Sequence, residues 1–94
     1  MIFVINRLKY DTDKMELISV NCEYSYSYGI FKDTFRYSGR NVKLWKSKKN
    51  NWLITYDSDF SSCGVAIDEA NAKSMLLKYD IAKYEEIFGE LEEA

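Results

Sequence analysis

The sequence contains no histidine and no proline, and only two of its 94 residues are cysteine. Histidine is the commonest general base near neutral pH, so its absence removes the catalytic dyads and triads that depend on it. A structural zinc site needs four ligands drawn mainly from cysteine and histidine, which this chain alone cannot supply. Cys22 and Cys63 are therefore expected to be small apolar core residues of a reducing compartment, and a disulfide between them is expected only in a secreted protein.

Glycine is also scarce, and its four positions are isolated from one another. No glycine-rich phosphate loop is present, so the sequence predicts no nucleotide cofactor. Long apolar runs are missing as well. The run Met1-Ile2-Phe3-Val4-Ile5 stops at Asn6, far short of a signal sequence or a membrane span, and it predicts a buried first strand.

The carboxylate pair Asp57 and Asp59 is the one candidate for catalysis. Residues two apart can share a strand face, where such a pair can bind a cation or act as acid and base. An Asp-Ser-Asp sequence after a strand is equally typical of a turn. Neither cysteine has a basic neighbour in sequence that would lower the pKa of its thiol. We expect no enzymatic activity, no metal and no cofactor.

The length predicts one domain covering residues 1–94 with a single hydrophobic core. Apolar and branched residues predict strands at 2–5, extending up to residue 10, at 15–22, and at 63–67. The clearest hairpin joins 42–46 to 52–56 through a polar turn containing Asn50 and Asn51, since asparagine tolerates positive φ. Asp11-Thr12-Asp13 predicts a further turn.

The C-terminal third predicts two helices. Asp68 is a suitable N-cap for the first helix, and Asp80 is expected to end it and to cap the second. Gly89 is expected to close the second helix in a left-handed conformation.

The segment 23–41 is expected to be an irregular aromatic connection with a short helical or extended piece near 32–37, although the alternation of Tyr24, Tyr26 and Tyr28 also suits a strand. The fold class is α+β, with an antiparallel sheet of three to five strands and one or two C-terminal helices on one face.

Charge is distributed unevenly along the chain. Residues 30–50 carry a net charge of +6, whereas residues 57–94 carry −7, and the whole chain carries −2. Basic and aromatic residues alternate within 31–52, as expected for a surface that binds DNA or RNA by stacking and phosphate contacts. A lysine-rich hairpin that protects an edge strand from aggregation would give the same pattern. The candidate residues of this surface are Tyr24, Tyr26, Tyr28, Phe35, Arg36, Tyr37, Lys43, Trp45 and Lys46.

The acidic part of the chain suggests a different partner. A negative patch can occupy the basic groove of a nucleic-acid enzyme and compete with its phosphate ligand. Acidic residues on terminal helices also commonly serve only to keep a protein soluble. The candidate residues of this patch are Asp57, Asp59, Glu85, Glu86 and Glu90.

Three stretches carry a resemblance to a known group of proteins. They are residues 7–14 with Tyr10-Asp11-Thr12, the hairpin 44–53, and Ala70 with Tyr84 and Phe88-Gly89. The chain is similar to a family of short proteins from Gram-positive bacteria and their phages or mobile elements, which have a Tyr-Asp-Thr start and a Leu-aromatic-Lys-Thr-Lys hairpin. It departs from them at Asn50, where glycine is usual, and in lacking a glycine-rich segment after the hairpin.

Some small proteins of this kind inhibit host defence, among them anti-CRISPR proteins. The resemblance therefore implies an inhibitor in the host-cell cytoplasm that binds a CRISPR effector or a similar complex and blocks nucleic-acid engagement. It transfers no site residues. The alternative is a small DNA- or RNA-binding regulator that uses the segment 31–52. No membrane partner is expected, and a homodimer is compatible with the sequence.

Overall fold

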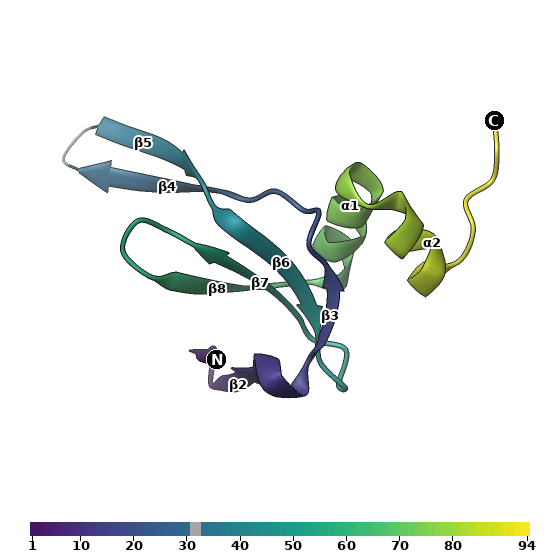
Figure 1. Cartoon of the computed structure of the whole chain (residues 1–94), viewed down its shortest axis with the longest axis horizontal. Helices are drawn as coiled ribbons and strands as arrows, with labels where there is room; N and C mark the ends of the chain where they lie inside the picture. Colours follow the sequence, from purple (N-terminus) through teal and green to yellow (C-terminus); the bar gives the residue numbers. More distant parts are fainter. Residues whose placement is uncertain (31–32) are drawn as a thin grey trace.

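A four-stranded antiparallel sheet, which we call the main sheet, forms the centre of the fold (Figure 1). The computed structural model describes residues 1–30 and 33–94. The strands of the main sheet lie in the order β3-β6-β7-β8, and their bounds are β3 Glu16–Ser19, β6 Arg40–Lys46, β7 Trp52–Asp57 and β8 Ser62–Ile67. Two short helices follow β8, so the predicted α+β class is confirmed.

The hairpin of β6 and β7 forms where the sequence predicts it. Leu44 lies opposite Ile54 in the register, and Asn50 in the turn has a φ of 63°. Leu44 and Ile54 are fully buried on the face of the main sheet that the helices cover. This face holds the main hydrophobic core, to which the first helix contributes Ala72 and Leu76.

Two aspartates set the limits of the helices, as expected from the sequence. Asp68 accepts a hydrogen bond of 2.7 Å from the backbone N–H of Asn71 and begins α1 (Glu69–Tyr79). Asp80 ends α1 and caps α2 (Ile81–Phe88) by accepting from the N–H of Lys83. Gly89 follows α2 with a φ of 105° and a ψ of 160°, so it ends the helix at positive φ but outside the left-handed helical region. None of the helices in the described ranges has the length and apolar content that crossing a membrane requires.

The N-terminal segment corrects the prediction of a buried first strand. It forms an antiparallel hairpin of β1 (Ile2–Ile5) and β2 (Leu8–Asp11), in which Val4 is 73% exposed. Asn6 and Arg7 both adopt positive φ in its two-residue turn, the geometry that matches the twist of paired strands. The predicted turn after β2 is present as a short 3₁₀ helix, η1 (Thr12–Lys14).

This hairpin covers the face of the main sheet opposite the helices. The ring of Phe3 lies so close to Gly64 of β8 that an added Cβ would come within 2.7 Å of the ring. Leu53, whose side chain points away from the helix-covered face, is nevertheless fully buried, and Tyr10 of β2 is 7% exposed. The main sheet is therefore covered on both faces, by helices on one and by β1 and β2 on the other.

The segment 23–41 is also more regular than expected. β4 (Ser25–Ile30) and β5 (Asp33–Ser38) pair as a separate antiparallel hairpin that extends beyond the main sheet (Figure 1), and no helical piece forms in its described residues. The strand suggested by the tyrosine alternation is thus the correct alternative. At Gly39 the chain crosses into β6 directly over Tyr56, where an added Cβ would lie 2.9 Å from the Tyr56 Cβ.

Candidate functional site

Asp57 and Asp59 are held apart by different partners. Asp57, the last residue of β7, accepts hydrogen bonds of 2.9 Å from the Asn41 amide and from the Ser62 hydroxyl. The bond from Asn41, followed by that from Ser62, lowers the pKa of the Asp57 carboxyl. Asp59 pairs with Arg40 at 3.1 Å. A carboxyl with a lowered pKa is a poor proton donor at neutral pH, and both carboxylates are engaged in contacts that fix the turn after β7.

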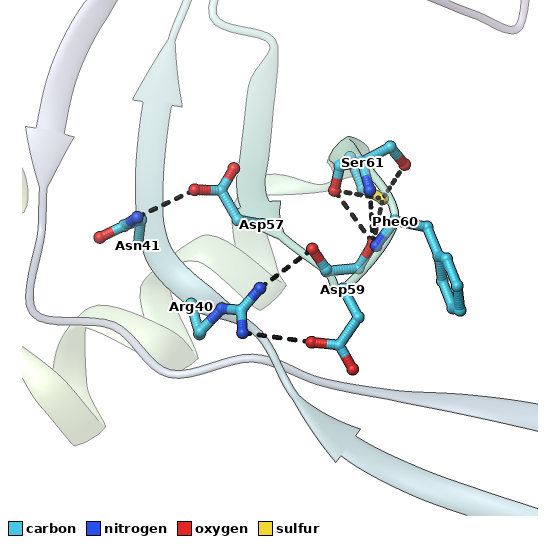
Figure 2. Close-up of polar contacts among 8 residues, drawn as sticks. Arg40, Asn41, Asp57, Asp59, Phe60 and Ser61 are labelled. Atoms are coloured by element: carbon cyan, nitrogen blue, oxygen red, sulfur yellow. Dashed lines mark hydrogen bonds and ion pairs between the residues drawn. The ribbon is translucent and has the colours of Figure 1, made fainter.

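The connection between β7 and β8 forms a rigid turn that presents an exposed aromatic ring. The Ser58 hydroxyl oxygen accepts from the N–H groups of Phe60 and Ser61, and the Ser58 N–H donates to the Ser61 carbonyl. Arg40 donates to the Ser58 carbonyl at 3.2 Å and joins this turn to β6. Figure 2 shows the Phe60 ring turned away from all of these contacts. Phe60 is 93% exposed, the highest value among the large hydrophobic side chains of the described residues.

The remaining residues of the predicted acidic patch lie elsewhere. Glu85 and Glu86 belong to α2, at the opposite end of the main sheet from the turn between β7 and β8 (Figure 1). Glu86 pairs with Lys83 at 3.0 Å, and the Glu85 carboxylate accepts from the N–H of Leu91 in the C-terminal tail. Glu90 is exposed in that tail. The structure therefore does not bring the five predicted acidic residues into one patch.

The tyrosines predicted for recognition are largely used in packing. Tyr24 and Tyr26 lie against Tyr56, with ring centroids 4.9 and 5.2 Å apart, and Tyr26 stacks on Tyr37 at 5.7 Å. Tyr24 and Tyr26 are half-buried against the core, whereas Tyr37 is 43% exposed. Burial raises the pKa of Tyr56 to about 12, with a contribution from its hydrogen bond to Cys63. Tyr24 and Tyr26 thus join β4 and β5 to the main sheet, whereas Tyr37 keeps an exposed surface.

The other aromatic and basic candidates are dispersed. Arg36 is exposed on β5, next to Tyr37 and on the opposite face of the hairpin. The side chains of Tyr28 and Phe35 lie outside the described part of the structure. Lys43 and Trp45 line a hollow of about 250 Å³ between the N-terminal hairpin and the main sheet. The indole N–H of Trp45 donates to the Thr55 hydroxyl at 2.8 Å, which fixes the indole in this hollow.

Lys46 belongs to a group of lysines that the sequence does not reveal as a unit. We call this group the lysine cluster; it comprises Lys9, Lys14, Lys46, Lys48 and Lys49. The cluster lines two adjoining hollows where β2 and η1 meet the turn between β6 and β7, and Asp11, Asp13 and Glu16 lie in the same hollows. Within residues 1–30 and 33–94, none of the five lysines makes an ion pair. Five lysines against three carboxylates leave an excess of positive charge in these hollows, which favours anions.

The two cysteines lie in different surroundings. Both thiols are free, and Cys22 is buried in the core. Burial raises the pKa of the Cys22 thiol, so the reactive thiolate is disfavoured at neutral pH. Cys63 is half-buried on β8 beside Ser61, with an S–O distance of 3.7 Å. In the described part of the chain, no group of three or more cysteine and acidic side chains is placed to hold a metal ion.

Sequence reasoning missed two features of these surfaces. Phe60 follows no periodic pattern, and only the turn geometry exposes it. Lys9 and Lys14 are distant in sequence from Lys48, and the path of the N-terminal hairpin brings them together. The chain matches no protein-family model, no curated protein and no solved structure.

Proposed function

We propose that this protein acts by binding another protein, and that it is an inhibitor rather than an enzyme. The observation that carries this proposal is Phe60, whose ring is 93% exposed on a turn fixed by Ser58 and by the Arg40–Asp59 ion pair. An aromatic ring in a partner's pocket is the typical centre of a protein interface. Burial of a phenylalanine side chain contributes roughly 1.5–3 kcal/mol.

The rigidity of the turn increases the affinity that the Phe60 ring can contribute to binding. Ordering a flexible loop on binding costs affinity, and a segment already held in one conformation avoids much of that cost. Four hydrogen bonds within 58–61 and two bonds from Arg40 hold the backbone and Asp59 before any partner arrives. Phe60 is thus suited to act as a preorganised anchor.

The class of partner follows from the family resemblance. Some small proteins of that kind from phages and mobile elements inhibit host defence, so we propose a defence complex such as a CRISPR effector, bound in the host-cell cytoplasm, as the target. Blocking nucleic-acid engagement sterically requires only occupation of the partner's surface. It needs neither a metal nor a cofactor.

Affinity capture tests this proposal. The wild-type protein, immobilised and exposed to lysate of a Gram-positive host that carries a CRISPR system, should retain a nucleic-acid-binding defence protein. Phe60→Ala should weaken retention at least about tenfold, because losing a well-buried anchor costs 1.4 kcal/mol or more. Leu77→Ala is the matched control, since Leu77 is a 41% exposed apolar residue on α1, and it should retain the partner. Recovery of metabolic enzymes alone, or equal retention by both variants, would contradict the proposal.

The lysine cluster favours a second candidate function, the binding of DNA or RNA through phosphate contacts. If all five lysines contact phosphates, the logarithm of the affinity for duplex DNA should fall with a slope of about −4.5 against the logarithm of salt concentration. Fluorescence anisotropy with a duplex should then show binding at about 50 mM salt that is lost near 200 mM. Lys14→Ala and Lys48→Ala should each make the slope less negative. Lys73→Ala should leave the slope unchanged, because Lys73 lies over the Phe88 ring. Absence of binding at the lower salt concentration would eliminate this candidate.

A further inference from the structure

Strand β8 leaves one side of the main sheet open. Among the strands of the described residues, β8 pairs with β7 alone, and all six of its residues are in register without a bulge. Its sequence Ser-Cys-Gly-Val-Ala-Ile has no charged residue and no proline. Edge strands are usually protected from pairing by lysines, prolines or bulges. The opposite edge strand β3 has such protection, since it contains Glu16 and an irregular register between Leu17 and Ser19.

The outer backbone groups of β8 have no partner within the chain as described. Apart from the ladder with β7, no backbone or side-chain hydrogen bond in residues 1–30 and 33–94 reaches the N–H or C=O groups of residues 62–67. These groups form a row that an extended chain can pair with.

A groove runs beside β8 on the helix-covered face of the main sheet. It has a volume of about 420 Å³ and lies between β8, α1 and the segment that leads into β4. Val65 and Ile67 of β8, Met75 and Tyr79 of α1, and Tyr24 supply its apolar side chains. Side chains of a strand added to β8 would alternate between the two faces, so every second one would enter this groove. Backbone pairing would supply affinity, and the groove would supply specificity.

The charges at the two ends of β8 decide what kind of strand fits. Before the strand lie Asp57, at the end of β7, and Asp59, which pairs with Arg40, and just after it lie Asp68 and Glu69. Pairing of β8 with a second copy of itself would place carboxylates against carboxylates in either direction, which is unfavourable. A strand with basic residues at its ends would instead meet opposite charges.

We propose that β8 binds an extended segment of another protein as a fifth strand of the main sheet. The segment has apolar side chains at alternate positions, which enter the groove beside Val65 and Ile67, and lysine or arginine at its ends. This inference rests on the proposed protein-binding function and names the surface and the partner segment. Phe60 lies at the start of β8 and would contact the partner beyond the added strand.

A synthetic peptide, Lys-Thr-Val-Thr-Val-Thr-Val-Lys, tests the inference directly. Titrated into the isotope-labelled protein, it should shift the backbone resonances of residues 62–67 and of Met75. It should also slow hydrogen exchange at alternate amides of β8, which is the signature of strand pairing. A peptide with the same interior and glutamate at both ends should bind more weakly. Unchanged exchange along β8 at millimolar peptide would overturn the inference.

Two controls separate strand addition from non-specific binding of the peptide. N-methylation of alternate peptide residues should weaken binding at least about tenfold in one register and leave it intact in the other, since only one edge of the peptide pairs with β8. Val65→Lys should weaken binding to a similar degree, and Leu17→Lys on the opposite edge strand should not. If Val65→Lys does not fold, the two peptides that are N-methylated in opposite registers still test whether the peptide backbone pairs with β8.

Failure of this inference is distinguishable from failure of the proposed function. If the wild-type protein captures a partner through Phe60 but the peptide leaves β8 unprotected, only the strand-addition inference fails. If the peptide protects β8 but no protein is captured, only the proposed function fails. If sedimentation shows a homodimer, and β8 is protected from hydrogen exchange without peptide, the added strand comes from a second copy of this chain. That result would overturn the inference that it comes from another protein.

Discussion

The Ser19 hydroxyl donates a hydrogen bond of 2.6 Å to the Asp80 carboxylate across 61 positions of sequence. Ser19 ends β3 and is 4% exposed, and Asp80 is the junction between α1 and α2. One oxygen of Asp80 accepts from Ser19 and from the Asn21 amide, while the other accepts from the Lys83 N–H. A single carboxylate therefore caps a helix and fastens the helices to the edge of the main sheet.

Asp80→Ala should destabilise the protein more than loss of a helix cap alone. Loss of an N-cap costs about 0.5–2 kcal/mol, and a buried hydroxyl left without its acceptor costs a further 1–3 kcal/mol. We expect a total loss of about 2–4 kcal/mol in the free energy of unfolding, measured by urea denaturation.

Asp68→Ala is the matched control, because Asp68 caps α1 without a bond to the sheet. It should cost only about 1 kcal/mol. The loss of stability in Asp80→Asn should lie between those of Asp80→Ala and Asp68→Ala. The amide oxygen of the asparagine can still cap α2, but its NH₂ group cannot accept from Ser19. Equal losses for Asp80→Ala and Asp68→Ala would mean that the bond to Ser19 contributes no stability.

The same carboxylate should make the protein sensitive to acid. The hydrogen bond from Ser19 is the main cause of the lowered pKa of Asp80; burial, the second largest effect, opposes it, and the bond from Asn21 lowers the pKa further. The folded state therefore releases this proton at a lower pH than the unfolded state. The stability that results is fully present above the ordinary pKa of 3.8 and is lost as the pH falls through the folded pKa.

Urea midpoints measured from neutral pH down to about pH 3 should thus fall steeply below about pH 4 in the wild type. In Asp80→Asn the fall should be shallower. It should not vanish, because hydrogen bonds also lower the pKa of Asp57. If Asp80→Asn has the same pH dependence as the wild type, Asp80 does not contribute to the loss of stability in acid.

The parts of the fold that local chemistry determines could be predicted from the sequence. Asp68 and Asp80 are capping residues in front of helical patterns, and Asn50 marks a turn between two strands of branched and aromatic residues. The turn of the N-terminal hairpin was missed because Asn6-Arg7 lacks the glycine that usually marks such turns. The strand pair β4 and β5 depends on Tyr26 packing against Tyr56, a contact that no local pattern reveals.

The candidate site was less predictable for the same reason. The sequence identifies which residues are charged, but their grouping depends on the paths of distant segments. Lys9 joins Lys48 and Lys49 because β2 returns beside the turn between β6 and β7, whereas α2, which carries Glu85, lies at the other end of the main sheet from the turn between β7 and β8. The open edge at β8 is a property of sheet order, which composition does not determine.

Gly64→Ala should loosen the N-terminal hairpin. An added Cβ would lie 2.7 Å from the Phe3 ring, so the ring and β1 would have to move. Overpacking of this kind costs about 1–3 kcal/mol. Hydrogen exchange should become faster in β1 and β2, while α1 should change little. The double variant Gly64→Ala with Phe3→Leu should recover part of the loss, because the smaller side chain leaves room for the methyl group. No recovery would mean that the strain lies elsewhere.

Tyr56 should ionise well above the ordinary pKa of a tyrosine. Burial is the main cause of its pKa of about 12, compared with an ordinary value of 10.0. Because the folded state keeps the phenol protonated, the resulting stability is fully present below pH 10 and is lost between about pH 10 and 12. Phenolate absorbance should show a titration step near pH 12 that Tyr56→Phe abolishes. Tyr37→Phe, which removes a partly exposed phenol from the same ring cluster, should leave that step in place. If the step survives in Tyr56→Phe, another group produces it, and the assignment of the raised pKa to the buried Tyr56 phenol is wrong.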